Sequence, residues 1–113
     1  MVIGNGLIAN HFKSYIYDVD VVIFASGVSN SLENDTGEFL REINLIKETI
    51  SKYRSATFIY FSTLSIVDSS LKNRQYVIHK LNIEKYIFNY CNNFIIFRVS
   101  NLVGPCRTYI YIC

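Results

Sequence analysis

Short, nearly continuous apolar segments alternate in this chain with longer segments in which apolar residues recur every three or four positions. The short segments are Met1–Ile3, Val19–Ala25, Ala56–Phe61 and Phe94–Val99. Their length and their β-branched and aromatic content are typical of strands buried on both faces of a parallel sheet. Strands that alternate with helices indicate β-α-β units with right-handed crossovers. We therefore predict an α/β fold, Rossmann-like and three-layered, with an abridged, mainly parallel sheet of about four strands.

The segments between the predicted strands have the periodicity of amphipathic helices. One helix is expected soon after the first strand, where Leu7, Ile8, Phe12 and Tyr15 recur at helical spacing. A second is expected from about Thr36 to Tyr53, and a third from around Asn73 to Tyr90. In the second helix the apolar positions are Phe39, Ile43, Ile46 and Ile50, and the polar residues between them are Glu38, Arg41, Glu42, Lys47 and Glu48.

Composition narrows the classes of partner. With 50% hydrophobic and 18% charged residues among 113, the chain is too apolar to be disordered. The formal net charge of +2 comes from scattered residues without a basic block, so we expect no nucleic-acid partner. No apolar run approaches the roughly 18 residues of a membrane span, and no charged leader precedes an apolar stretch, so a cytoplasmic protein without a membrane partner is expected.

Three cysteines, Cys91, Cys106 and Cys113, form an odd set without the spacing of metal ligands. We expect reduced thiols and no metal site.

A glycine turn follows the first predicted strand. A tight turn that brings its backbone up to a pyrophosphate needs residues without a Cβ atom, and Gly4-x-Gly6-x-x-Ala9 fits this need. The same pattern is also a plain way to begin a helix. The acidic residue that grips an adenosine ribose is expected about 20 positions later. Asp18 and Asp20 come before the second strand instead, and a solvated turn is the better interpretation for them.

A threonine, a tyrosine and a lysine form a candidate catalytic set. Tyr76 and Lys80 are four residues apart on a predicted helix and share one face. An adjacent ammonium favours the ionised form of a phenol, so we expect Lys80 to lower the pKa of Tyr76. Thr63 lies at the carboxyl end of the preceding strand, where its hydroxyl can bond the same substrate oxygen. The alternative is a tyrosine packed at the sheet edge, a surface lysine and a capping threonine.

Several segments in order resemble one family. They are VIGNGLIA at 2–9, DVVIFASG at 20–27, the helix around Asn44-Leu45-Ile46, FIYFST at 58–63 leading to Ser65-Ile66-Val67, YVIHK at 76–80 and FRVSNLVGP at 97–105. Together they resemble the extended short-chain dehydrogenase/reductases, the family of NAD-dependent sugar-nucleotide epimerases, dehydratases and reductases.

The resemblance implies a cofactor, NAD or NADP, and a nucleotide-sugar substrate. It implies Tyr76 as acid/base, Lys80 as the residue that lowers its pKa and holds the nicotinamide ribose, and Thr63 as the residue that orients the substrate. It also implies a set of cofactor contacts: Gly4, Asn5, Gly6, Leu7, Ile8, Ala9, Ala25, Ser26, Gly27 and Lys80. Asn101 is implied to lie near the nicotinamide or the substrate.

Two further charged residues have simpler interpretations. His79 neighbours Lys80 but points to a different face of the helix, so an exposed position is expected. Arg98 stands near the end of a buried strand and is expected to be the partner in a structural ion pair.

The chain also departs from the family. The segment before Asp18 is too short for the family's second and third strands, so the first strand is expected at the edge of the sheet and the adenine side of the site is expected to be shallow. Residues 1–105 are predicted to form the abridged NAD(P)-binding domain, and residues 106–113 the truncated start of a substrate-binding region. Apolar surface left by such a loss makes a homodimer a further expectation.

Three functional hypotheses remain open. The first is an NAD(P)-dependent epimerase, dehydratase or reductase domain that acts on a nucleotide-linked sugar, with hydride transfer at the nicotinamide and proton transfer through Tyr76. The second is a nucleotide-binding remnant or module without catalysis, which lacks a substrate domain. The third is a flavodoxin-like or receiver-like interaction domain in which the Tyr76 and Lys80 pair is accidental.

Overall fold

The computed structural model describes residues 1–28, 34–100 and 110–112. Along the chain, the elements are β1 (Val2–Ile3), α1 (Leu7–His11), the 3-10 turn η1 (Lys13–Tyr15), β2 (Val21–Phe24), α2 (Thr36–Lys52), β3 (Thr57–Thr63), η2 (Leu64–Val67), η3 (Ser69–Leu71), α3 (Gln75–Tyr90), β4 (Phe94–Val99) and β5 (Ile110–Ile112). Strands and helices alternate as predicted. Among the described residues, no helix is long and apolar enough to cross a membrane.

The strands form one sheet in the order β1-β2-β3-β4-β5. The first four strands pair in parallel, which confirms an α/β, Rossmann-like fold with four parallel strands. β1 lies at the edge, as expected from the short segment before Asp18. β5 pairs antiparallel with β4 and was not predicted. The domain boundary expected at residue 105 lies outside the described residues.

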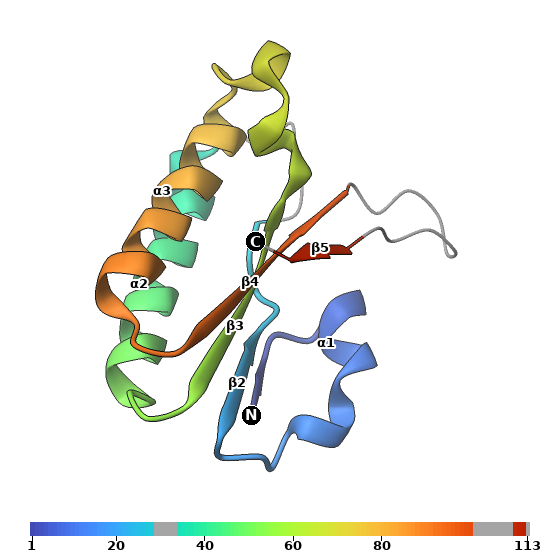
Figure 1. Ribbon diagram of the computed structural model, residues 1–113, viewed down its shortest axis with the longest axis vertical. Coiled ribbons are helices and arrows are strands. Elements are labelled where there is room, and N and C mark those ends of the chain that lie inside the picture. The colour runs from blue at the N-terminus through green and yellow to red at the C-terminus, as the bar shows by residue number, and fades with distance from the viewer. Residues whose placement is uncertain (29–33, 101–109, 113) are drawn as a thin grey trace.

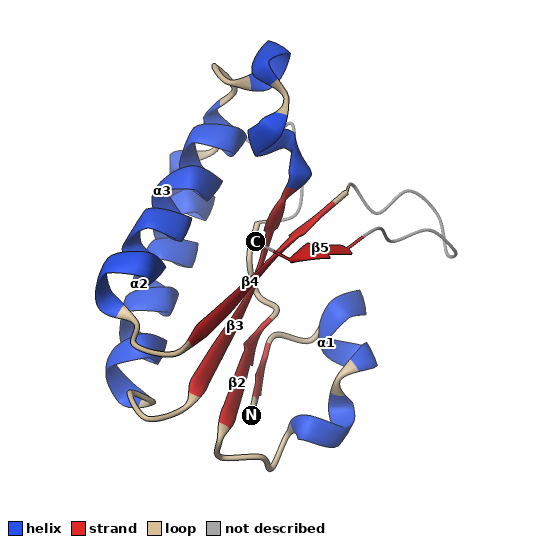
Figure 2. Cartoon of the chain, in the orientation of Figure 1, coloured by secondary structure: helices blue, strands red, loops and turns tan. Residues whose placement is uncertain are grey.

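Helices cover both faces of the sheet, and thus three layers form (Figures 1 and 2). α2 and α3 lie side by side on one face, and α1 with η1 lies on the other. Neighbouring residues of β3 mark the two faces because side chains alternate along a strand. The Tyr60 hydroxyl reaches Glu42 of α2, whereas the Phe61 ring lies 5.9 Å from the ring of Phe12, which directly follows α1.

The position of α1 corrects one expectation about the crossovers. The strands β1 to β4 run parallel and lie in consecutive order, so connections of the same hand would all lie on the same face. α1 is on the face opposite to α2 and α3, and therefore the connection from β1 to β2 has the opposite hand to the two that follow it (Figure 1). The expectation that every crossover is right-handed is wrong for this first unit.

α1 is also shorter than its sequence pattern suggests. The helix ends at His11, and the chain tightens into η1, which contains Tyr15. Tyr15 is 43% exposed, so the apolar spacing from Leu7 to Tyr15 does not correspond to one buried helical face. The following turn is a polar one, as expected: the Asp20 amide donates to the Asp18 carboxylate at 2.9 Å.

The main core lies between the sheet and the α2–α3 layer. Its buried residues are Val22, Phe24, Ile46, Ile50, Ala56, Phe58, Tyr60, Ile83, Ile87 and Ile96. Full burial of one such aliphatic or aromatic side chain stabilises a fold by roughly 1.5–3 kcal/mol. A second, smaller cluster of Val28, Phe39, Tyr76 and Val77 lies toward the carboxyl ends of the strands. The candidate site is built around this second cluster.

Candidate functional site

The predicted site residues gather beyond the carboxyl ends of β1, β2 and β3. This is the edge at which open α/β sheets bind ligands. Gly4 follows β1, Ala25 to Gly27 follow β2, and Thr63 ends β3. Asn101, the predicted substrate contact, lies outside the described residues.

Gly4 is required by the fold itself. Its φ angle is +117°, and a Cβ atom at this position would stand 2.5 Å from the carbonyl oxygen of Ala25. The contact arises because the Ala25 amide donates to the Ile3 carbonyl at 2.7 Å and draws the ends of β1 and β2 together. The first glycine of the turn thus has a structural reason, independent of any ligand.

No comparable structural constraint requires a glycine at position 6. Gly6 precedes α1 with a φ of −85°, which any residue can adopt, and no atom lies within 4 Å of where its Cβ would be. The space beside it fits the close approach of a dinucleotide's pyrophosphate, which a larger side chain would obstruct. Of its neighbours, Asn5 is exposed, Ile8 is half-buried and Ala9 is buried.

The loop after β2 is held by α2. Arg41 donates through Nη1 to the carbonyl oxygen of Ser26 at 2.9 Å and to its hydroxyl at 3.2 Å. Gly27 lies against two charged groups: a Cβ there would come within 2.5 Å of Glu42 Oε2 and 2.9 Å of Lys80 Nζ. Gly27 is therefore needed for the packing of this loop on charged side chains beneath it.

Thr63 and Tyr76 lie close together. Both are buried, and the Thr63 side chain is near enough to the phenol to lower its pKa. Thr63 Oγ1 accepts from the Ser65 amide at 3.1 Å, which fixes the turn that follows β3. Burial and the negative charge of Glu42 raise the pKa of Tyr76 to about 12, and the Thr63 side chain opposes them only in part.

Lys80 lies close to Tyr76, but its ammonium donates hydrogen bonds to Glu42 and Tyr60. Its ammonium is 5.6 Å from the centre of the Tyr76 ring and donates to Glu42 Oε2 at 3.0 Å and to the Tyr60 hydroxyl at 2.9 Å. The side chain is only 2% exposed. The expectation that Lys80 lowers the pKa of Tyr76 is wrong for this structure, because the Glu42 carboxylate neutralises the ammonium and itself disfavours a tyrosinate.

Glu42 is the centre of this arrangement. Its carboxylate accepts hydrogen bonds from Tyr60 at 2.6 Å, from Lys80 and from the Val28 amide at 3.2 Å, and His79 Nε2 lies 2.6 Å from Oε1. Burial alone would raise the pKa of Glu42, but the bond with His79 and the charge of Lys80 outweigh it, and the pKa falls to about 2. Glu42 is therefore ionised despite being fully buried.

His79 corrects a second expectation. The residue is 5% exposed rather than solvated, and its ring stacks on Phe39 with the ring centres 4.4 Å apart. The interpretation as an exposed helix residue failed because α2 packs alongside α3 and covers this face. Burial also raises the pKa of Tyr60 well above its usual value, so its hydroxyl remains a donor to Glu42.

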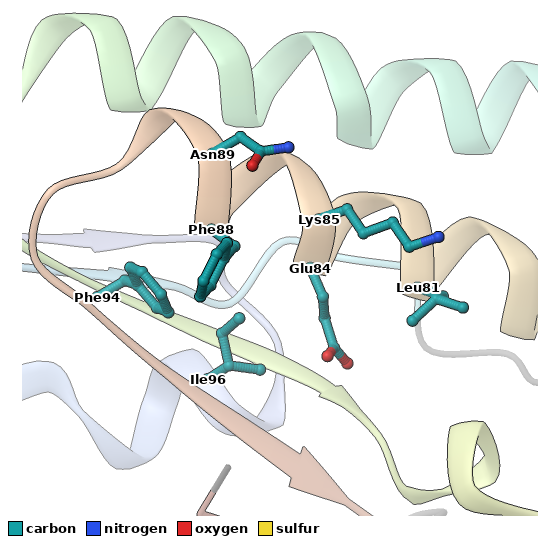
Figure 3. A pocket seen from close by; sticks show the side chains of 7 residues that line it. All are labelled: Leu81, Glu84, Lys85, Phe88, Asn89, Phe94 and Ile96. Carbon is teal, nitrogen blue, oxygen red and sulfur yellow. The ribbon is translucent and has the colours of Figure 1, made fainter.

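Arg98 forms the structural ion pair that was expected. It binds Glu84 through Nε at 3.1 Å and through Nη2 at 2.8 Å, and the Ser62 hydroxyl donates to the same carboxylate at 2.6 Å. This second buried acid ties α3 to β3 and β4. Beside it lies an open hollow of about 440 Å³, lined by Leu81, Glu84, Lys85, Phe88, Asn89, Phe94 and Ile96 (Figure 3). The hollow includes none of the predicted site residues.

Sequence reasoning missed Glu42 and Tyr60. Glu42 was assigned to the polar face of its helix, yet it lies three residues after Phe39 and four before Ile46, both of which are buried. That spacing places it on the core face. Tyr60 was counted only as part of a buried strand. A glutamate at an apolar helical position, opposite a tyrosine in a strand, was the available signal for a buried polar cluster.

Among residues 1–28, 34–100 and 110–112, no group of three His, Cys, Asp or Glu side chains could hold a metal ion. A scan of protein-family models, a search of curated proteins and a search of solved structures found no match for this chain.

Proposed function

We propose that this chain is the nucleotide-binding part of an NAD(P)-dependent epimerase, dehydratase or reductase. The observation that carries the proposal is the pairing of Thr63 with Tyr76 at the carboxyl end of β3, with Lys80 one helical turn further along α3. Residues predicted from two separate segments of the chain thus lie together. The open space beside Gly6 supports a dinucleotide as the ligand. A nucleotide-linked sugar as substrate rests on the resemblance alone.

The bound dinucleotide would supply hydride transfer, and the chain's own residues would manage the proton. With its pKa raised to about 12, Tyr76 holds its proton at neutral pH. It therefore serves as a general acid toward a substrate carbonyl oxygen, and Thr63 orients the same oxygen by hydrogen bonding. A tyrosine that holds its proton is in the form needed for the step in which a carbonyl oxygen gains a hydrogen-bonded proton on reduction.

A second candidate is a module that binds the dinucleotide without turnover. The pairing of Lys80 with Glu42 favours it, because an ammonium enclosed by Glu42, Tyr60 and Gly27 does not reach a ribose in this arrangement. Both candidates require the same binding site, and they differ in whether Tyr76 transfers a proton.

Fluorescence titration of the purified protein with NADH and NADPH tests the shared requirement. Wild type is compared with Gly6→Val, which fills the space beside α1, and with Gly6→Ala, which fills less of it. Saturable binding that Gly6→Val abolishes supports a dinucleotide site. If wild type shows no binding up to about millimolar cofactor, both candidates fail. The binding free energy would then be weaker than about −4 kcal/mol.

Where binding is found, Tyr76→Phe distinguishes the two candidates. Reduction of carbonyl-containing nucleotide sugars is followed as loss of NADH absorbance. Epimerisation and dehydration, which return the hydride to the sugar, are followed by chromatography of the sugar products. Turnover that the variant loses while it still binds NADH supports the enzyme. If neither wild type nor Tyr76→Phe shows turnover although both bind NADH, the module without catalysis is favoured.

A further inference from the structure

The carboxylate of Glu42 joins three parts of the candidate site that are distant in sequence. It accepts from the Val28 amide in the loop after β2, from the Tyr60 hydroxyl in β3 and from Lys80 in α3. Glu42 itself is 0% exposed, so none of these bonds is replaced by water. A carboxylate has about four lone-pair positions, and with His79, whose Nε2 lies 2.6 Å from Oε1, four groups of the chain surround it here.

Val28 connects this carboxylate to Tyr76. Its amide is bound by Glu42 and its side chain belongs to the buried cluster that contains Phe39, Tyr76 and Val77. Gly27, the residue before it, leaves no room for a Cβ atom between the loop and the charged pair of Glu42 and Lys80. The loop that carries Ala25, Ser26 and Gly27 is thus held down on α3 at the point where Tyr76 lies.

We propose that Glu42 is a positioning residue for the cofactor side of the site: by binding the Val28 amide and the Lys80 ammonium together, it fixes the loop after β2 against the helix that carries Tyr76. The consequence for dinucleotide affinity rests on the function proposed above. The positioning of the loop does not, and it is measured separately.

Glu42→Gln is the informative change. A glutamine keeps the size of the side chain but offers one acceptor oxygen, and its amide nitrogen is a donor that faces other donors. The Val28 amide then either loses its acceptor or competes with the Tyr60 hydroxyl and the Lys80 ammonium for the single amide oxygen. Glu48→Gln is the matched control, because Glu48 is an exposed glutamate of the same helix. Where Glu42→Gln does not fold, Glu42→Gln with Lys80→Met removes both charges and serves in its place for the exchange measurement alone, because Lys80 is itself a predicted cofactor contact.

Amide hydrogen exchange measures how firmly the loop after β2 is held, and NADH titration measures the affinity of the site for the dinucleotide. Exchange of the Val28 amide is compared with that of the Phe58 amide, which bonds the Asn93 carbonyl at the start of the core strand β3. The ratio of the two rates corrects for any loss of global stability. In Glu42→Gln we expect this ratio to rise roughly tenfold or more, the effect of losing a hydrogen bond to a charged group, and the dissociation constant for NADH to rise by a similar factor. Glu48→Gln changes neither.

An unchanged ratio in a folded Glu42 variant overturns the positioning role. A raised ratio with unchanged NADH affinity overturns its connection to the cofactor. If wild type binds no dinucleotide, the proposed function fails, and the exchange ratio still decides whether Glu42 holds the loop.

Discussion

Lys80 Nζ lies 3.0 Å from Glu42 Oε2, in a part of the core from which water is excluded. Each charge is costly to bury alone, and the attraction between them offsets that cost only while both are present. Burial lowers the pKa of Lys80, and the neighbouring carboxylate opposes that effect. The pair is therefore sensitive to the removal of either member.

Lys80→Met should lower the free energy of unfolding by about 3–5 kcal/mol, because it leaves the Glu42 carboxylate buried without its counterion. Urea denaturation measures the loss. Glu38→Gln, which removes one member of the exposed pair with Arg41, should cost less than about 1 kcal/mol. The double variant Glu42→Gln with Lys80→Met should lose less than the sum of the single variants. Additive losses would mean that the two side chains are not coupled.

Glu42 should also make stability dependent on pH in the acid range. Its pKa falls from the ordinary 4.5 to about 2 in the folded protein, so its contribution is complete above pH 4.5 and is lost as the pH falls toward 2. At about 1.4 kcal/mol per unit, the contribution is about 3 kcal/mol.

Urea denaturation between about pH 6 and about pH 3 checks this dependence, since the window spans most of the shift. The difference in unfolding free energy between wild type and Glu42→Gln should shrink as the pH falls. A difference that stays constant would show that Glu42 keeps its ordinary pKa.

Two glycines should respond to the same substitution by different amounts. Gly27→Ala places a methyl group within 2.5 Å of Glu42 Oε2 and 2.9 Å of Lys80 Nζ, and such overpacking costs about 1–3 kcal/mol. Gly6→Ala meets no atom within 4 Å, and as a change at the N-cap of α1 it should cost less than about 1 kcal/mol. Thermal denaturation of both variants compares them directly. Equal melting temperatures would contradict the close contact between Gly27 and the buried pair.

The fold was largely accessible from the sequence because each strand and helix has its own local pattern. Phe94–Val99 was predicted with the bounds that the structure gives, and the second helix begins at Thr36 in both. Asp35 explains the latter, since its side chain caps the helix by accepting from the Gly37 amide at 2.8 Å. The side of the sheet on which α1 lies was not accessible, because it depends on which strands are neighbours. The formation of β5 also depends on pairing with a strand elsewhere in the sheet.

The candidate site was accessible only in part. The order of segments in the family resemblance was enough to select Thr63 and Tyr76 as a pair. The direction of the Lys80 ammonium depends on Glu42, 38 residues earlier in the chain. Periodicity assigns a charged residue to the solvent unless a partner is known, and the partners of Glu42 come from a strand, a loop and another helix. Such a cluster becomes visible only when these elements are packed together.

Tyr76 provides the sharpest test of whether this site is set for proton release. Burial and the charge of Glu42 raise its pKa to about 12, so the phenol should remain protonated throughout the neutral and mildly alkaline range. Ultraviolet titration of wild type and Tyr76→Phe should give the same tyrosinate absorbance below about pH 10, the ordinary pKa of the side chain. Glu42→Gln should move the ionisation of Tyr76 to lower pH, because it removes the negative charge that opposes a tyrosinate. A tyrosine that ionises near neutral pH in wild type and is missing from Tyr76→Phe would show that Lys80, not Glu42, controls the phenol.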